Sequence, residues 1–308
     1  GIYMKHQISR RTKRNMAKSV KGIFLILYLI IVMFPFYWML NTSLKSSMTD
    51  IYAFPVTYWP EQPSLVNYLE ILWKGNFTTY VRNSFFYSMI ASVAAVIVGL
   101  CASYVLSRFK FRGKKAVLIF FLVTQMVPVF TVLAPMYQIL AKLHLRNTFF
   151  TLPLLYFNMC IPFSVVTLRG FYAGVPVSLE EAARIDGCSR LKAIWHISLP
   201  IMKPGIAATL IFDFINSWNE LFMATYFIDE ETYKTITVGL NSLILKYDVK
   251  WGEMAAGSIL ALLPTIFLFA FAQKYMVEGL SAGAQRSEEH TSELQSLIQL
   301  VCRHLLEK

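Results

Sequence analysis

The stretch SFFYSMIASVAAVIVGLCASYVLS, residues 84–107, decides the fold of this chain because it carries no charged side chain over its whole length. The hydrocarbon core of a bilayer is about 30 Å thick, and about 20 apolar residues of α-helix cross it. Residues 84–107 are therefore long enough to span a membrane. The whole composition agrees, since 56% of the 308 residues are hydrophobic and 15% are charged, against about 25% charged in soluble domains.

Five further segments meet or approach the same length and apolar character. Their approximate ranges are 20–40, 116–141, 148–168, 205–228 and 254–274. The sequence thus predicts an all-α membrane protein with six transmembrane helices. We expect a basic N-terminal segment at 1–19 and a transmembrane domain over 20–286, with a helical loop between the fourth and fifth spans.

The basic residues alternate between the predicted loops. Residues 1–22 carry seven basic and no acidic side chains, and the loop after the second span carries five and none. The loop after the fourth span is also rich in arginine and lysine, whereas residues 229–253 hold five acidic side chains against three basic ones. Short cytoplasmic loops collect lysine and arginine. We therefore expect a multi-pass membrane protein with both termini in the cytoplasm.

Other classes of function are not favoured by the residue patterns. The net charge is +11, but the basic residues are concentrated in alternate loops instead of forming one stripe. Nucleic-acid binding is therefore not expected. The four cysteines form no C-x-x-C pair, and we expect packed or free thiols and no metal. Gly279–Gly283 matches the hydrolase pattern G-x-S-x-G, but it follows a membrane helix instead of a strand, so no catalytic residue is predicted.

The basic loop at 170–203 contains the run EAARIDGCSRLKAIWHISLP, which begins at Glu181. Ser178 with Glu181 three residues later has the pattern of a capping box at a helix start. Gly187 is expected to end that helix. The local pattern therefore predicts a short amphipathic helix followed by a glycine hinge.

A second short helix is expected after the hinge, with Ser189 as its N-cap and with Pro200 and Pro204 ending it. At helical spacing, one face collects Leu191, Ile194, Trp195 and Ser198. An apolar patch of this kind is more naturally buried against a protein than left in water. The alternative is that Glu181 serves only as a helix cap and that the unit lies on lipid headgroups.

Taken together, the Glu-Ala-Ala helix, the glycine hinge and the later Ile-x-Leu-Pro resemble the cytoplasmic coupling loop of ABC-importer permeases. In that family the loop docks in a groove of a separate ATPase. The present chain differs at Cys188, where the family often has alanine. The resemblance implies that ATPase coupling resides in Ser178, Glu181, Ala182, Ala183, Asp186, Gly187, Ile197, Leu199 and Pro200.

The resemblance covers most of residues 20–284 and points to the carbohydrate-uptake branch typified by the smaller maltose permease subunit. SWNELFMAT at 217–225 is similar to the Trp-Asn-Glu-Phe segment of that branch, with Leu221 in place of Phe. WGEMAAGSILALLP at 251–264 and QKYMVEGLSAGA at 273–284 are also similar. The implied function is that of the permease subunit of an ATP-driven, binding-protein-dependent importer of sugars or related carbohydrate solutes. The implied location is the bacterial cytoplasmic (inner) membrane.

The same resemblance implies the partners of the chain. They are a second homologous permease, a dimer of ATP-binding cassette ATPases and an extracytoplasmic solute-binding protein. The chain has no G-x-x-x-x-G-K-[ST] loop for nucleotide phosphates. ATP and Mg are accordingly expected in the ATPase, and no cofactor is expected in this chain.

Polar residues inside the predicted spans are candidates for the substrate pathway. An ionised carboxylate at a helix centre costs roughly 2.5–3.5 kcal/mol on insertion scales, so Asp213 is expected to face the bundle interior. The candidates are Asp213, Asn216, Trp218, Asn219, Glu220, Gln125 and Asn158. Each of the polar side chains can instead serve as an interhelical contact, worth about 0.6 kcal/mol on average. An ion-coupled secondary transporter without an ATPase would also explain them, but it leaves the hinged cytoplasmic unit without a role.

The two ends of the chain carry separate expectations. Residues 287–308 break with the preceding composition, and we interpret them as a non-native tail read from vector or adapter sequence. A regulatory tail is the alternative, although no motif supports it. The chain opens at Gly1, and Met4 is a possible true start.

Overall fold

A computed structural model of the chain describes residues 2–73, 75–244, 249–271 and 273. This part is almost wholly helical, and its one β-type pairing is an isolated bridge between Ile244 and Val249. The helices long and apolar enough to cross a membrane are Lys18–Ser43, Phe77–Arg108, Thr151–Ala173, Arg190–Trp218 and Trp251–Phe271. The predicted all-α membrane class is confirmed. The predicted tail at 287–308 and the Gly279–Gly283 pattern lie outside the described residues.

The third predicted span, 116–141, is broken into two helices. α5 (Lys114–Thr124) and α6 (Val129–Lys142) meet at an angle of 97°. Pro128 precedes α6 in an extended conformation with φ −61° and ψ 132°. Proline lacks an N–H and disfavours the helical conformation in the residue before it, so it separates the two helices here. The pair makes a sixth candidate span only when both helices are counted together.

The two prolines predicted to end a short helix before the fifth span lie inside a long helix instead. α9 (Arg190–Ala193), the π-helix η1 (Ile194–Ser198) and α10 (Leu199–Trp218) follow one another without a break. The Leu199 N–H bonds to the carbonyl of Ile194, five residues back. Pro200 follows this wider turn in the first turn of α10. The π-turn interrupts the regular i→i−4 hydrogen bonding just before Pro200, at the point where the proline cannot donate an N–H.

The far end of the fifth predicted span, 205–228, is also interrupted. α10 stops at Trp218, and α11 (Phe222–Phe227) begins after residues 219–221. Apolar residues resume directly after this break, so the predicted span continued through it. The polar pair at 219–220 marks the interruption.

The chain divides into two compact units, each described here by itself. The first comprises residues 1–77 and 240–261 and contains α1 (Ile2–Ser43), α2 (Met48–Ile51) and α3 (Val66–Trp73). The Asn67 side chain joins α3 to the end of α1 by donating to the carbonyls of Ser43 at 2.9 Å and Lys45 at 2.7 Å. The apolar side chains of α1 from Val20 to Leu40 are largely exposed within this chain.

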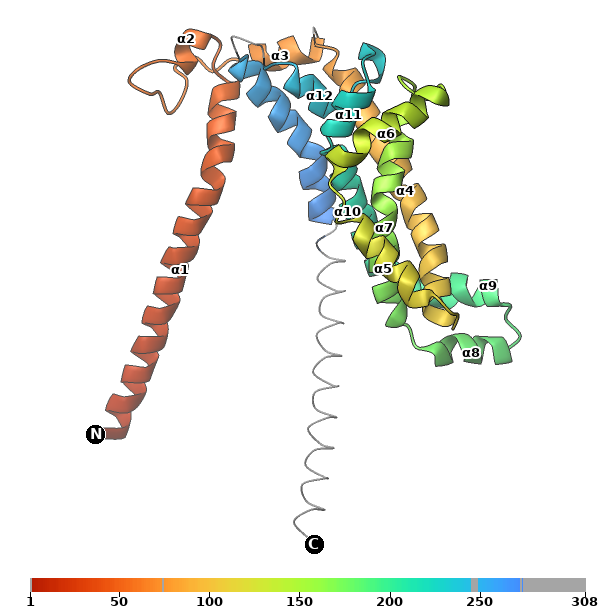
Figure 1. Cartoon of the computed structure of the whole chain (residues 1–308). Coiled ribbons are helices and arrows are strands. Elements are labelled where there is room, and N and C mark those ends of the chain that lie inside the picture. The colour runs from red at the N-terminus through yellow and green to blue at the C-terminus, as the bar shows by residue number, and fades with distance from the viewer. Residues whose placement is uncertain (1, 74, 245–248, 272, 274–308) are drawn as a thin grey trace. The chain divides into compact units, whose positions relative to one another are not determined.

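The second unit comprises residues 78–239 and 262–308 and holds the candidate site. Its central helices are α4 (Phe77–Arg108), α7 (Thr151–Ala173) and α10, which lie side by side in Figure 1. One buried cluster includes Tyr87, Leu152, Tyr156 and Phe227, and a second includes Val96, Leu168, Tyr172 and Met202. The remaining elements are η2 (Glu231–Tyr233) and most of α12 (Ile236–Asn241).

Close packing of α10 on α7 depends on Gly205. A Cβ atom built on Gly205 would lie 2.3 Å from Cγ of Phe171 on α7. Small residues at helix contacts in membranes let backbones approach closely. Gly205 therefore sets how near the start of α10 lies to the end of α7, from which the following loop departs.

Candidate coupling site

The first helix of the predicted coupling loop, α8 (Val177–Ile185), begins earlier than the capping pattern indicated. Its N-cap is Pro176, with φ −60° and ψ 131°, and Ser178 is its second residue and exposed. The predicted capping box with Ser178 as N-cap is wrong. Pro176 brings the backbone into the extended conformation of an N-cap two residues before Ser178, so the helix is already under way when the serine is reached.

Gly187 ends α8 as predicted. It adopts φ +88°, its N–H bonds to the Arg184 carbonyl at 3.2 Å, and the next N–H, that of Cys188, bonds to Ala183 at 2.9 Å. This pair of bonds is the Schellman motif, which satisfies the last carbonyls of a helix and favours glycine at the left-handed position. The glycine hinge predicted from the sequence is therefore a defined turn.

The helix after the hinge begins as predicted but carries its side chains differently. The Ser189 hydroxyl accepts a bond from the Lys192 N–H at 3.4 Å, which confirms the N-cap. Leu191 and Trp195 are 79% and 70% exposed, whereas Ser198 is fully buried. Ser198 therefore does not share the exposed apolar face. It lies at the end of the π-helix η1, whose wider turn departs from the α-helical spacing used for the prediction.

Most of the nine residues predicted for coupling lie on the surface of this unit. Ala183 is buried and Ile197 and Leu199 are half-buried, while the exposed members are Ser178, Glu181, Ala182, Asp186, Gly187 and Pro200. Large apolar side chains are exposed beside them, with Ile185 at 86%. Residues 178–200, the hinged unit, thus present an apolar surface that nothing in the described part of the chain covers.

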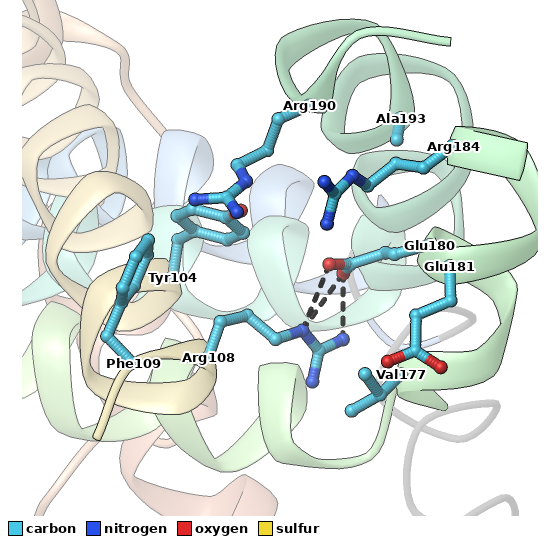
Figure 2. A pocket seen from close by; sticks show the side chains of 9 residues that line it. All are labelled: Tyr104, Arg108, Phe109, Val177, Glu180, Glu181, Arg184, Arg190 and Ala193. Atoms are coloured by element: carbon cyan, nitrogen blue, oxygen red, sulfur yellow. Dashed lines mark hydrogen bonds and ion pairs between the residues drawn. The ribbon is translucent and has the colours of Figure 1, made fainter. Parts of the chain in front are cut away.

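Glu180, the neighbour of the predicted Glu181, is the buried acid of α8. Arg108 at the end of α4 donates from Nε to both carboxylate oxygens at 3.1 Å and from Nη2 to Oε1 at 2.8 Å. The Ser198 hydroxyl at 2.7 Å and the Tyr172 hydroxyl at 3.2 Å donate to the same Oε1. The arginine and glutamate side chains are 10% and 11% exposed. Figure 2 shows the two groups facing each other across the pocket.

The electrostatics of this cluster keep the Glu180 carboxylate charged. Burial raises the pKa of Glu180, but the bonds from Arg108, Ser198 and Tyr172 outweigh it and leave the pKa below its usual value. A lowered folded-state pKa means that the pair stabilises the fold above the unfolded pKa. The contribution is lost only as pH falls through the lowered pKa, so the ion pair is present at neutral pH.

A cavity of about 170 Å³ opens beside this ion pair. Figure 2 shows its lining, to which α4 contributes Tyr104 and Arg108 and the hinged unit contributes Glu181, Arg184 and Arg190. The Arg190 guanidinium lies 5.3 Å from the centroid of the Phe109 ring. The cavity marks where α4 meets the hinged unit.

Glu180 was not predicted as a functional residue from the sequence. Arg108 was counted only among the basic residues that indicate on which side of the membrane a loop lies. A signal was available, because Glu180 and Ala183 are three residues apart and share the inner face of α8, whereas Glu181 and Ala182 fall outside it. The pairing itself spans 72 residues. Local spacing could not reveal such a partner.

Asp213 faces the interior of the second unit, as predicted. It is 1% exposed, and its Oδ2 accepts a hydrogen bond from Ser164 on α7. Cys160, one turn earlier on α7, lies 3.4 Å from the Ser217 hydroxyl. Within the described residues, Asp213 Oδ1 has no hydrogen-bond partner. Asp213 therefore joins α7 to α10.

Two other pathway candidates have structural contacts. Trp218 is buried and stacks on Phe214, with ring centroids 5.7 Å apart. The Glu220 carboxylate accepts from the N–H groups of Met223 at 2.9 Å and Ala224 at 3.1 Å. Glu220 therefore caps the start of α11, since carboxylates satisfy the free N–H groups of a first turn.

The remaining candidates are exposed on this unit. They are Gln125, Asn158, Asn216 and Asn219. Asn216 on α10 and Asn219, the C-cap of α10, follow Phe212 at spacings of four and three, so the three share one exposed stripe at the end of this helix. The predicted pathway set therefore separates into a packed group and a group free to contact another molecule.

Loss of the Ser164 hydroxyl is expected to destabilise the second unit. Ser164→Ala removes the bond to Asp213 and leaves a buried carboxyl group poorly satisfied, a change worth about 1–3 kcal/mol. The measurement is the thermal unfolding midpoint of the purified chain in detergent, which should fall. Ser103→Ala is the matched control, because the bond of that buried hydroxyl among the described residues goes to the Leu100 carbonyl of its own helix at 2.9 Å. Equal midpoints for the two variants would contradict this account.

Comparison with known proteins assigns the chain to a family. Residues 91–281 match the family described as "Binding-protein-dependent transport system inner membrane component". The chain belongs to this family. Membership is consistent with its helical fold and makes it a multi-pass membrane component of such a transport system, while the orientation of its termini stays a prediction.

Individual members of the family align over nearly their full length. The chain is 34% identical to the diacetylchitobiose uptake system permease protein DasC of Streptomyces coelicolor, with 82% of this chain and 91% of DasC covered. It is 33% identical to the inner membrane ABC transporter permease protein YcjP of Escherichia coli, with 88% and 97% covered. It is 31% identical to the trehalose/maltose transport system permease protein MalG of Thermococcus litoralis, with 85% and 95% covered.

A solved structure shares the fold. A chain in the crystal structure of a bacterial ABC transporter involved in the import of the acidic polysaccharide alginate superposes with a TM-score of 0.73. The match covers 85% of this permease and 97% of that chain at 21% identity. At this identity the structural similarity establishes the fold of the permease but does not identify the solute that it transports.

Proposed function

We propose that this chain is the permease subunit of an ATP-driven, binding-protein-dependent importer of sugars or related carbohydrate solutes. The observation that carries the proposal is the hinged unit of residues 178–200, with its exposed apolar side chains in a chain that lacks a nucleotide-binding loop. Energy for transport then comes from a separate subunit. ATP and Mg bind in that ATPase, and this chain binds no cofactor.

The geometry of the hinged unit suits a protein partner. Ile185, Leu191 and Trp195 are each at least 70% exposed and come from both sides of the Gly187 turn. Exposed apolar groups of this size mark interaction sites. An ATP-binding cassette ATPase that closes on ATP would press on this surface, and the spans would then alternate between outward-open and inward-open states.

The carbohydrate class and the further partners are inferred from relatives. Three relatives are named for the uptake of diacetylchitobiose, of trehalose or maltose, and of maltodextrin. A structural relative of 15% identity was crystallised with an alginate-bound periplasmic protein. We accordingly propose a second permease, an ATPase dimer and an extracytoplasmic solute-binding protein as partners.

Reconstitution with the genes next to its own tests this function. The chain, the adjacent permease, the ATPase and the binding protein are placed in proteoliposomes and offered radiolabelled maltose, trehalose and diacetylchitobiose. Uptake should require ATP in the compartment of the ATPase and should persist when ionophores collapse ion gradients. Uptake that survives without ATP and stops with the ionophores would instead establish the ion-coupled secondary transporter.

The exposed polar stripe of α10 is proposed to line the solute pathway. Asn216→Ala and Asn219→Ala are each expected to raise the KM for the transported sugar several-fold, since each removes about one hydrogen bond worth 0.5–1.5 kcal/mol. ATPase co-purification should stay unchanged, because the stripe lies at the opposite end of α10 from the hinged unit. Asn241→Ala, an exposed asparagine outside the long apolar helices, is the control. A KM equal to that of this control would exclude the stripe from the pathway.

A further inference from the structure

The attachment of α8 to the rest of the second unit is unusually polar. All residues of α8 are described, and the two that are buried are Glu180 and Ala183. A single methyl group offers little apolar area, so hydrophobic contact alone cannot hold this helix in place. The Glu180 carboxylate, with its hydrogen bonds to three other elements, is the principal contact that fixes α8.

Those bonds converge from separate parts of the unit. Arg108 lies at the end of α4, Tyr172 near the end of α7, and Ser198 in η1 at the entrance to α10. Arg108 is itself fixed by a bond from Nη2 to the Val175 carbonyl at 2.9 Å, and its guanidinium lies 4.8 Å from the Tyr172 ring centroid. The chain enters α8 directly from α7, whereas α4 is joined to α8 by Arg108, which provides the hydrogen bonds between these two helices in the described part of the chain.

We propose that the Arg108–Glu180 ion pair is the positioning joint through which α8 and α4 move as one body. This inference rests on the proposed function, in which a partner ATPase displaces the hinged unit. A planar arginine fork resists rotation as well as separation, because it bonds both carboxylate oxygens at once. Displacement of α8 is thereby passed to a membrane-crossing helix of 32 residues.

Neutralising either partner is expected to separate ATPase capture from transport. In the reconstituted full complex, Arg108→Gln and Glu180→Gln should retain ATPase co-purification, because the exposed apolar surface is unchanged. Transport of radiolabelled maltose, trehalose or diacetylchitobiose per ATP hydrolysed should fall about tenfold, the size of a typical coupling between two sites. Transport per ATP hydrolysed should fall no further in the double variant than in either single variant, because each substitution already removes the same ion pair.

Two further variants separate positioning from charge. Arg108→Lys keeps the charge but loses the fork, so the amount of sugar carried per ATP should again fall. The charge-swapped double variant, Arg108→Glu with Glu180→Arg, should recover part of the coupling lost in the single variants. Arg112→Gln is the matched control, because it removes an exposed positive charge four residues from Arg108.

A spectroscopic distance reports on the joint without any transported sugar. Spin labels at the exposed positions Lys110 and Arg184, in a chain whose native cysteines are replaced by alanine, follow α8 relative to the end of α4. The distance distribution should be narrow in the parent chain and broad in Arg108→Gln. A narrow distribution in both would show that α8 is held by other contacts and would overturn the proposal.

The outcomes distinguish this inference from the proposed function. Coupling in Arg108→Gln and Glu180→Gln equal to that in Arg112→Gln would overturn the joint while leaving an ATP-driven permease intact. Single effects that multiply in the double variant would show that the two residues act separately, which also overturns it. If a single variant fails to accumulate, the charge-swapped variant provides the test. ATP-dependent transport in that variant supports the joint, and a lack of ATP-dependent transport counts against it.

Discussion

Gly187→Pro is expected to abolish capture of the ATPase while leaving the chain inserted in the membrane. Proline fixes φ near −65°, whereas residue 187 lies at φ +88°, and proline also removes the N–H that bonds to Arg184. The Schellman turn cannot form, so the exposed apolar groups before and after the hinge no longer share one surface. Co-purification of the ATPase from detergent-solubilised membranes measures the effect.

Gly113→Pro is the matched control for this result. Gly113 has φ +90° and, like Gly187, has no heavy atom near a built Cβ. The backbone strain is therefore the same, but the position lies in a different loop, before α5. Capture should survive in this variant. Co-purification and transport at parental levels in Gly187→Pro would defeat the coupling assignment of residues 178–200.

Glu181→Ala becomes more informative through the structure. The sequence left open that Glu181 serves only as the helix cap paired with Ser178, but the N-cap of α8 is Pro176. Glu181 is exposed, so its removal should leave α8 intact and reduce capture of the ATPase. Unchanged helix content with lost capture is the expected combination in circular dichroism and co-purification.

Gly205→Leu is expected to produce the largest loss of stability. A built Cβ already lies 2.3 Å from Cγ of Phe171, an atom that stays in place when the ring turns about the Cβ–Cγ bond. The helices α7 and α10 must separate, and overpacking of this kind costs about 1–3 kcal/mol or more. The variant should unfold at a lower temperature in detergent and accumulate poorly in membranes.

Two comparisons test the steric origin of that loss. Gly170→Leu on α7 is the control, because a Cβ there meets no heavy atom within 4 Å. Adding Phe171→Ala to Gly205→Leu should restore part of the stability by making room for the new side chain. If Phe171→Ala destabilised the Gly205→Leu variant as much as it destabilises the parent chain, the two side chains would not clash.

Apolar length was enough to predict the membrane class and the approximate place of the spans. It failed where helices break inside apolar sequence, as at Pro128, which separates α5 from α6, and after Trp218. Hydropathy is similar on both sides of such breaks, so it does not mark them. Proline also misled in the opposite direction, since Pro200 and Pro204 lie within a helix whose π-turn precedes them.

Within the coupling unit, two features set by local backbone chemistry were predicted correctly, whereas the N-cap at Ser178 and the contacts with distant partners were not. Gly187 and Ser189 are short-range signals, and both behave as expected. The choice of Glu181 over Glu180 was made from a motif, which does not say which acid faces inward. The inward orientation of Asp213 was predicted correctly, because a charged carboxylate that faces lipid is costly and the side chain is therefore turned toward the interior of the bundle.

The sequence by itself determined that this protein crosses the membrane as helices and carries a glycine-hinged unit between two of them. Apolar length, loop charge and the φ preference of glycine are properties of short segments, so they can be read without a fold. Only the tertiary structure decided that Arg108 binds Glu180, that Ser198 turns inward and that Ser164 binds Asp213. These contacts depend on which helices pack together, and a buried charge takes its partner from whatever the packing brings within reach.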